Sequence, residues 1–146
     1  GESMYPNLHD KEQIVAEKIS VKSSSIKRGD IVIFKHPFEE DKLLIKRIIG
    51  LPGETLQIKD GSVYIDGEKL NEPYLSGDVI TKGSKLLEDN AEYKIRNNAY
   101  VVMGDNREES TDSREWGYVD KDLIVGKGVL VYFPLNRIRL IKSVNF

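Results

Sequence analysis

Ile and Val together outnumber Ala by 27 to 3 in this chain of 146 residues, and this imbalance constrains the fold more than any other feature. β-branched side chains lose rotamer freedom in helices and fit strands, whereas Ala favours helices. Hydrophobic residues make up 39% of the chain, which is enough for one core or for a core with a small appendage. The composition therefore favours an all-β fold and disfavours a helical bundle.

Charge and cysteine content exclude several classes of function. The 22 basic and 24 acidic residues give a net charge of −2, so there is no overall basic field for binding nucleic acid. The absence of Cys excludes thiol nucleophiles, disulfides and thiolate-ligated zinc. No apolar run approaches the ~20 residues that span a bilayer. The chain begins at Gly1 without an initiator Met, so a targeting or anchoring segment can have been removed, and the lack of an apolar span says little about the parent protein.

Short apolar runs separated by turn residues predict a series of strands. We expect them at 12–21, 31–34, 43–49, 56–59, 62–65, 68–70, 100–103 and 123–134. The pairs Asp60-Gly61 and Asp66-Gly67 are strong hairpin signals. Residues 71–98 are polar and rich in turn residues, which predicts a surface excursion that forms part of an insert or cap.

Common catalytic motifs are missing from the sequence. It contains no Gly-x-Ser-x-Gly elbow, His-Glu-x-x-His helix, P-loop or dinucleotide fingerprint. The two histidines, His9 and His36, lie beside turn residues, and we interpret both as solvated loop residues rather than as members of a triad. The tripeptide 28–30, Arg-Gly-Asp, is interpreted as a turn that leads into a strand.

Lys46 is a more informative candidate. On a strand over 43–49 it lies between Leu44 and Ile48 on one face. If that face is buried, desolvation lowers the pKa of the lysine and leaves a neutral amine that can act as a general base, for example toward a serine. If the strand is an edge, Lys46 extends to water instead. Periodicity alone favours the second interpretation.

Three segments, in order and covering most of the chain, together resemble the conserved boxes of bacterial type I signal peptidases. The nucleophile box is Ser3–Leu8; the base-bearing box is Arg28–Val32 followed by Ile45–Gly53; the third box is Gly104–Arg107 with Ser110, Asp112, Ser113 and Arg114. Members of this family are Ser-Lys enzymes that remove signal peptides from secreted preproteins. The three boxes together are highly specific evidence for this family, although each box alone is only modest evidence.

The resemblance implies a role for each matching residue. Ser3 matches the nucleophile and Lys46 the general base, and Ser110 matches the hydroxyl that orients the lysine amine. Asp112 and Arg114 match a supporting ion pair, and Asp105 matches a structural carboxylate. Five apolar residues match positions that line shallow pockets for the small side chains of an Ala-x-Ala motif: Met4, Leu8, Leu44, Ile45 and Val102.

Two positions depart from the family pattern. Asn7 stands where the family commonly has Thr, which preserves a polar turn. Gly1 stands where some members have a Ser whose hydroxyl helps to stabilise the oxyanion. The oxyanion is then expected to rely on the backbone N–H of Ser3, together with Gly1 backbone geometry or water. Losing one donor costs ~10²–10³ in rate where that donor is decisive.

The resemblance also implies architecture and location. We expect an all-β catalytic core of antiparallel sheets, of the kind shared by signal peptidases and LexA-like proteins, over 1–56 and 99–146. Residues 57–98 are expected to form a small β-rich cap insertion, short as in Gram-positive members. The implied partners are secretory preproteins and the membrane lipid surface, with no nucleic acid and no cofactor or metal. The family pattern predicts a monomer with an N-terminal anchor in the bacterial membrane and its catalytic domain on the extracytoplasmic side.

Two other functions stay open on the sequence. A LexA-like self-cleaving regulator shares the Ser-Lys core, but it predicts a DNA-binding module or an internal scissile loop, and no Ala-Gly cleavage site stands out. A non-catalytic homologue that acts as an assembly chaperone for surface proteins is disfavoured because both Ser3 and Lys46 are present. Cleavage of a signal-peptide substrate after a small residue separates the peptidase from the chaperone, which binds without cleaving.

Overall fold

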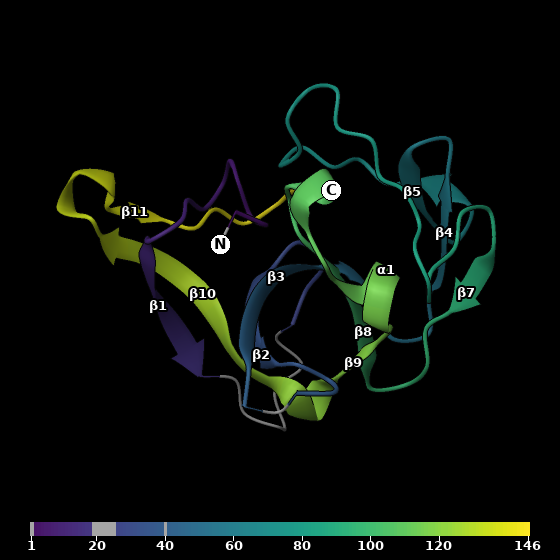
Figure 1. Ribbon diagram of the computed structural model, residues 1–146, viewed down its shortest axis with the longest axis horizontal. Coiled ribbons are helices and arrows are strands. Elements are labelled where there is room, and N and C mark those ends of the chain that lie inside the picture. The colour runs from purple at the N-terminus through teal and green to yellow at the C-terminus, as the bar shows by residue number, and fades with distance from the viewer. Residues whose placement is uncertain (1, 19–25, 40) are drawn as a thin grey trace.

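The computed structural model describes residues 2–18, 26–39 and 41–146, and it is built mainly from antiparallel strands (Figure 1). The larger sheet has the order β1-β10-β2-β3-β8-β9, and β11 pairs with the far end of β10. Its strands are β1 (Gln13–Lys18), β2 (Ile31–Lys35), β3 (Leu43–Gly50), β8 (Ala99–Met103), β9 (Val119–Asp120), β10 (Ile124–Phe133) and β11 (Arg139–Leu140). The all-β prediction is confirmed.

A smaller sheet follows β3 and has the order β6-β5-β4-β7. It contains β4 (Thr55–Lys59), β5 (Ser62–Ile65), β6 (Glu68–Lys69) and β7 (Glu92–Lys94). Asp60 and Gly61 have φ values of 50° and 76°, and the pair at 66–67 has 50° and 85°. Positive φ at both central residues is the requirement of a type I′ turn, so the two predicted hairpins are confirmed.

The two sheets share an apolar core. Leu56 and Ile58 of the smaller sheet pack in one cluster with Ile49 and Val101 of the larger sheet. The smaller sheet begins at Thr55, two residues before the expected start of the insertion. The division into a core of 1–56 and 99–146 and an insertion of 57–98 stays a prediction.

The predicted strands that lie within the described residues are present. The later part of the expected first strand, with Ile19 and Val21, lies outside the described residues. The charged segment between β8 and β9 holds a 3₁₀ turn, η1 (Arg107–Glu109), and one helical turn, α1 (Ser113–Trp116). Two further 3₁₀ turns are η2 (Lys121–Leu123) and η3 (Leu135–Arg137).

Two expectations about exposure are wrong. Residues 71–98 are more than a surface excursion, because Tyr74, Leu87 and Ile95 are buried in the shared core. His36 is not a solvated loop residue: its side chain is 12% exposed. Its ring centroid lies 5.3 Å from that of Trp116, which packs in the core. The turn at 28–30, by contrast, is confirmed and leads directly into β2.

Candidate active site

Ser3 is presented by a compact turn at the start of the chain. The N–H groups of Asn7 and Leu8 both donate to the carbonyl of Met4, at 2.9 Å. The side chains of Met4 and Leu8 are buried against Ile31 and Val131 of the larger sheet. This apolar anchor fixes the turn and leaves Ser3 partly exposed at its edge.

Lys46 lies on β3 and reaches Ser3. Its Nζ is 2.6 Å from Ser3 Oγ, although the two residues are 43 positions apart in the chain. Lys46 is only 5% exposed, so the interpretation that it extends from an edge strand to water is wrong. Burial lowers the pKa of Lys46 below that of free lysine; the negative charge of Asp112 opposes this shift, and the positive charge of Arg114 adds to it.

Ser110 lies beside this pair, but its hydrogen bonds go elsewhere. Its hydroxyl donates to Asp112 Oδ2 at 2.7 Å and accepts from the N–H of Gly104 at 3.2 Å. Among the described residues, the expected hydrogen bond from Ser110 to the Lys46 amine is not formed. Because the Ser110 hydroxyl already donates its hydrogen bond to Asp112, its remaining lone pair can only accept a hydrogen bond.

The expected pairing of Asp112 with Arg114 is present. Two nitrogens of the Arg114 guanidinium each donate to a separate Asp112 oxygen at 2.8 Å. Burial raises the pKa of the Asp112 carboxyl, but the hydrogen bonds and charge of Arg114 outweigh it, and the net shift is downward. Asp112 is therefore a carboxylate at neutral pH, and it also caps α1 and accepts from the N–H of Gly104.

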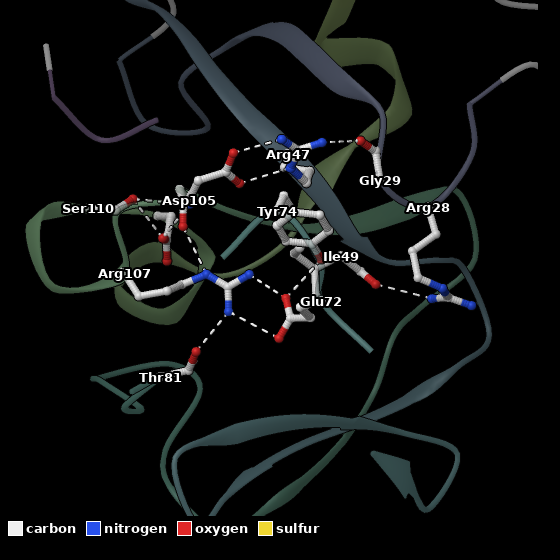
Figure 2. A network of polar contacts seen from close by, with 12 residues as sticks. Arg28, Gly29, Arg47, Ile49, Glu72, Tyr74, Thr81, Asp105, Arg107 and Ser110 are labelled. Carbon is white, nitrogen blue, oxygen red and sulfur yellow. Dashed lines mark hydrogen bonds and ion pairs between the residues drawn. The ribbon is translucent and has the colours of Figure 1, made fainter. Parts of the chain in front are cut away.

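Asp105 forms a second buried ion pair, with Arg47 of β3. Arg47 Nε and Nη2 donate to the two Asp105 oxygens at 2.8 and 2.7 Å, and Nη1 donates to the carbonyl of Gly29 (Figure 2). The Asn7 amide donates to Asp105 Oδ2 at 2.9 Å and to the carbonyl of Tyr74 at 2.7 Å. The Asn7–Tyr74 contact could not be predicted from the sequence, because its acceptor lies 67 positions away and nothing near Asn7 indicates it.

A groove of about 470 Å³ runs beside Ser3 and Lys46. Its apolar lining includes Met4, Leu8, Ile14, Leu44, Ile45 and Trp116. Four of the five residues expected to contact substrate are therefore brought together. Val102 is not: it is 0% exposed and packs with Ile48 in the core, because β8 is covered on both faces. The expectation that Val102 lines a substrate pocket is corrected.

The groove presents a serine beside a buried lysine, and the Asp112 carboxylate lies behind them in the third box. Among the residues that the structure describes, no group of His, Asp and Glu side chains is arranged to hold a metal ion. The polar groups around Ser3 can accept, hold and return a proton. They can therefore support acyl transfer.

Comparison with known proteins decides the family. The sequence model of the signal peptidase family, peptidase S26, matches residues 1–133. The chain belongs to this family. It is similar to signal peptidase I of Bacillus licheniformis, with 44% identity over 95% of this chain and 76% of that protein. Signal peptidase IB of Staphylococcus aureus N315 is 38% identical over 95% of this chain and 78% of its own length.

A solved structure gives the same result for the fold. The crystal structure of a signal peptidase I from Enterococcus faecalis V583 matches with a TM-score of 0.60 and 30% identity. The match covers 74% of this chain and 98% of that one. The protein is therefore a bacterial type I signal peptidase and a serine-protease hydrolase, of a membrane-associated family that removes signal peptides from secretory preproteins. Within the described ranges, no helix of this signal peptidase is both long and apolar enough to span a bilayer.

Proposed function

We propose that this signal peptidase cleaves preproteins with a Ser3–Lys46 dyad. The neutral Lys46 amine accepts the Ser3 hydroxyl proton while Ser3 Oγ attacks the carbonyl carbon of the scissile bond. The single observation that carries this proposal is the 2.6 Å contact between Ser3 Oγ and the buried Lys46 Nζ. Burial supports it further, because the lowered pKa of Lys46 keeps more of the amine neutral near pH 7.

The remaining steps use the same lysine. The protonated Lys46 gives its proton to the leaving amine as the carbon–nitrogen bond breaks, and the signal peptide stays attached to Ser3 as an ester. Lys46 then takes a proton from water as the water oxygen attacks the ester carbonyl. It returns that proton to Ser3 Oγ as the ester bond breaks, which frees the signal peptide and Ser3. The oxyanion is assigned to the backbone N–H of Ser3; the contribution of Gly1 lies outside the described residues.

Ser110, Asp112, Arg114 and Asp105 are assigned supporting roles. Asp112 accepts from Ser110 and leaves a Ser110 lone pair that can accept from the Lys46 amine once the site is occupied. Arg114 holds Asp112 ionised, and Asp105 joins β3 to the nucleophile turn through Arg47 and Asn7.

The groove is assigned to the residues before the cleaved bond. Met4, Leu8, Leu44 and Ile45 contribute its apolar lining next to the dyad, and a shallow apolar lining fits small side chains of the Ala-x-Ala type. Within the part of the chain that the structure describes, residues 43–46 of β3 pair with β2 on one side only, since β8 joins at Arg47. The free edge at 43–46 can add an extended substrate segment as a further strand.

A membrane surface is assigned to the end of the ribbon formed by β10, η3 and β11, which projects from the body of the molecule (Figure 1). Leu135 and Leu140 are 77% and 75% exposed there, and Phe133 and Ile138 are also exposed. The segment after Asp122 has four basic and no acidic residues. Exposed apolar side chains of this kind fit the surface of a bilayer. The monomeric state and the extracytoplasmic side of the membrane are proposed from the family resemblance alone.

The test is cleavage of a preprotein in detergent by Ser3→Ala and Lys46→Ala. Each variant should stay folded and lose activity by about 10⁴-fold or more, as expected when a member of a catalytic unit is removed. Turnover retained by Lys46→Ala contradicts the dyad. Binding of the preprotein without cleavage by the wild-type chain favours a chaperone, and cleavage of the chain itself favours a LexA-like regulator.

A further inference from the structure

The turn at Glu72–Tyr74, which belongs to the expected insertion, contacts both halves of the active site. The carbonyl of Tyr74 accepts the Asn7 amide of the nucleophile turn at 2.7 Å. The Arg47 guanidinium lies over the Tyr74 ring, with Arg47 Cζ 4.2 Å from the ring centroid. Figure 2 shows the Tyr74 ring next to Arg47 and the Glu72 carboxylate facing the Arg107 guanidinium. The insertion therefore reaches the nucleophile turn and the third box through adjacent residues.

Glu72 forms an ion pair with Arg107 of the third box. Its carboxylate pairs with the Arg107 guanidinium and accepts the Tyr74 hydroxyl at 2.8 Å. The side chains of Arg107 and Glu72 are 0% and 6% exposed, so each charge depends on the other for neutralisation. Arg107 Nη1 also donates to Thr81 Oγ1 of the insertion at 2.7 Å. Removing one partner of such a pair is strongly unfavourable, because an uncompensated charge stays buried.

Arg107 transmits this restraint to the dyad. Its Nε donates to the carbonyl of Gly104 at 2.8 Å. Gly104 packs against the carbonyl of Ser3 and the hydroxyl of Ser110 so closely that a Cβ has no room. The same Ser3 carbonyl accepts the N–H of Asn106 at 2.8 Å. A displacement of Arg107 therefore moves Gly104 against the residue that carries the nucleophile.

We propose that Glu72 is a positioning residue of the peptidase, which acts through Arg107 and Gly104 to hold Ser3 against Lys46. The proposal rests on the Ser3–Lys46 function above. Nothing in the sequence boxes assigns Glu72, which lies 35 positions before Arg107. The insertion is on this account a structural part of the catalytic site rather than a separate cap.

The test compares Glu72→Gln with wild type in the 146-residue chain. We expect kcat per folded molecule to fall by about tenfold to 100-fold, since a 1 Å misplacement at a catalytic centre costs ~10². KM should stay within about twofold, because the groove residues are not touched. Glu72→Asp keeps the negative charge, and its kcat should lie between those of wild type and Glu72→Gln. Glu54→Gln is the matched control: Glu54 pairs with Arg28 through both oxygens at 2.6 Å, away from the groove, and its kcat should be unchanged.

A second readout separates positioning from general stability. With ¹³Cε-labelled lysine, the Lys46 titration should move toward that of free lysine in Glu72→Gln, because a loosened loop admits water, and should not move in Glu54→Gln. An unchanged kcat per folded molecule, an equal loss in the control, or an unmoved titration overturns the proposal. If Glu72→Gln does not fold, the same measurements on Glu72→Asp decide. If wild type cleaves no preprotein, the proposed function fails, and the titration still decides the role of Glu72.

Discussion

Gly104→Ala is predicted to slow the peptidase by moving Ser3. A Cβ at this position would lie 2.5 Å from the carbonyl oxygen of Ser3, and it would also overlap the Ser110 hydroxyl. Gly104 does not have a positive φ, so alanine fits its backbone and the effect comes from contact alone. Opening the contact with Ser3 to an ordinary separation of about 3.4 Å requires a displacement of about 0.9 Å.

The size of the effect follows from that displacement. A misplacement of 1 Å costs ~10² in rate, which corresponds to about 2.7 kcal/mol of transition-state stabilisation. Extra volume in a packed interior also destabilises the fold by about 1–3 kcal/mol. We therefore expect kcat/KM to fall by about 100-fold in a protein that is still mostly folded.

The assay is steady-state cleavage of a preprotein in detergent, with the folded fraction taken from urea denaturation. Gly77→Ala is the control, since Gly77 is exposed, has no positive φ and has open space around its Cβ position. A folded Gly104→Ala enzyme with wild-type kcat/KM refutes the reasoning. A loss of activity that only follows the unfolded fraction refutes it equally.

Three further substitutions test the charges and hydrogen bonds around the site. Lys46→Met should raise the free energy of unfolding at pH 7, because the variant no longer buries an amine. Since the pKa of Lys46 is lowered in the folded state, the wild type gains stability as the pH rises toward ~10.4, and urea denaturation at pH 10.5 should give similar free energies of unfolding for the variant and the wild type. Glu12→Gln should cost about 1–2 kcal/mol at pH 7 and little near pH 2 in the same measurement, because Arg139 lowers the pKa of Glu12 from 4.5 to about 2. Asn7→Thr should cost about 1–3 kcal/mol in urea denaturation with activity retained, since a hydroxyl has one proton for two acceptors; an unchanged midpoint contradicts this.

Local sequence signals were sufficient for most of the strands. The run at 31–34 and the Asp-Gly pairs carry their own structural information, because β-branched side chains and positive φ act within a few residues. Strands β9 and β11 have two residues each, which is too short for a period-2 pattern to be recognised. They form because β8 and β10 offer them a partner.

The burial of residues 71–98 could not be predicted locally. Tyr74, Leu87 and Ile95 are separated by polar turns, so they show neither helical nor strand periodicity, and each is buried by a contact with the distant core. The prediction that Val102 lines a substrate pocket was wrong for a related reason: a match to a family position does not say which faces of β8 are covered. Periodicity alone favoured an exposed Lys46, whereas the resemblance favoured a buried one, and the structure agrees with the resemblance.

The pH dependence of kcat/KM tests the dyad most directly, because Lys46 must be neutral to accept the Ser3 proton. The account predicts a rising limb whose apparent pKa lies clearly below the ~10.4 of free lysine, and loss of turnover in Lys46→Ala at every pH. A limb near 10.4, or a Lys46→Ala enzyme that cleaves preprotein with the wild-type profile, contradicts the assignment of Lys46 as the general base.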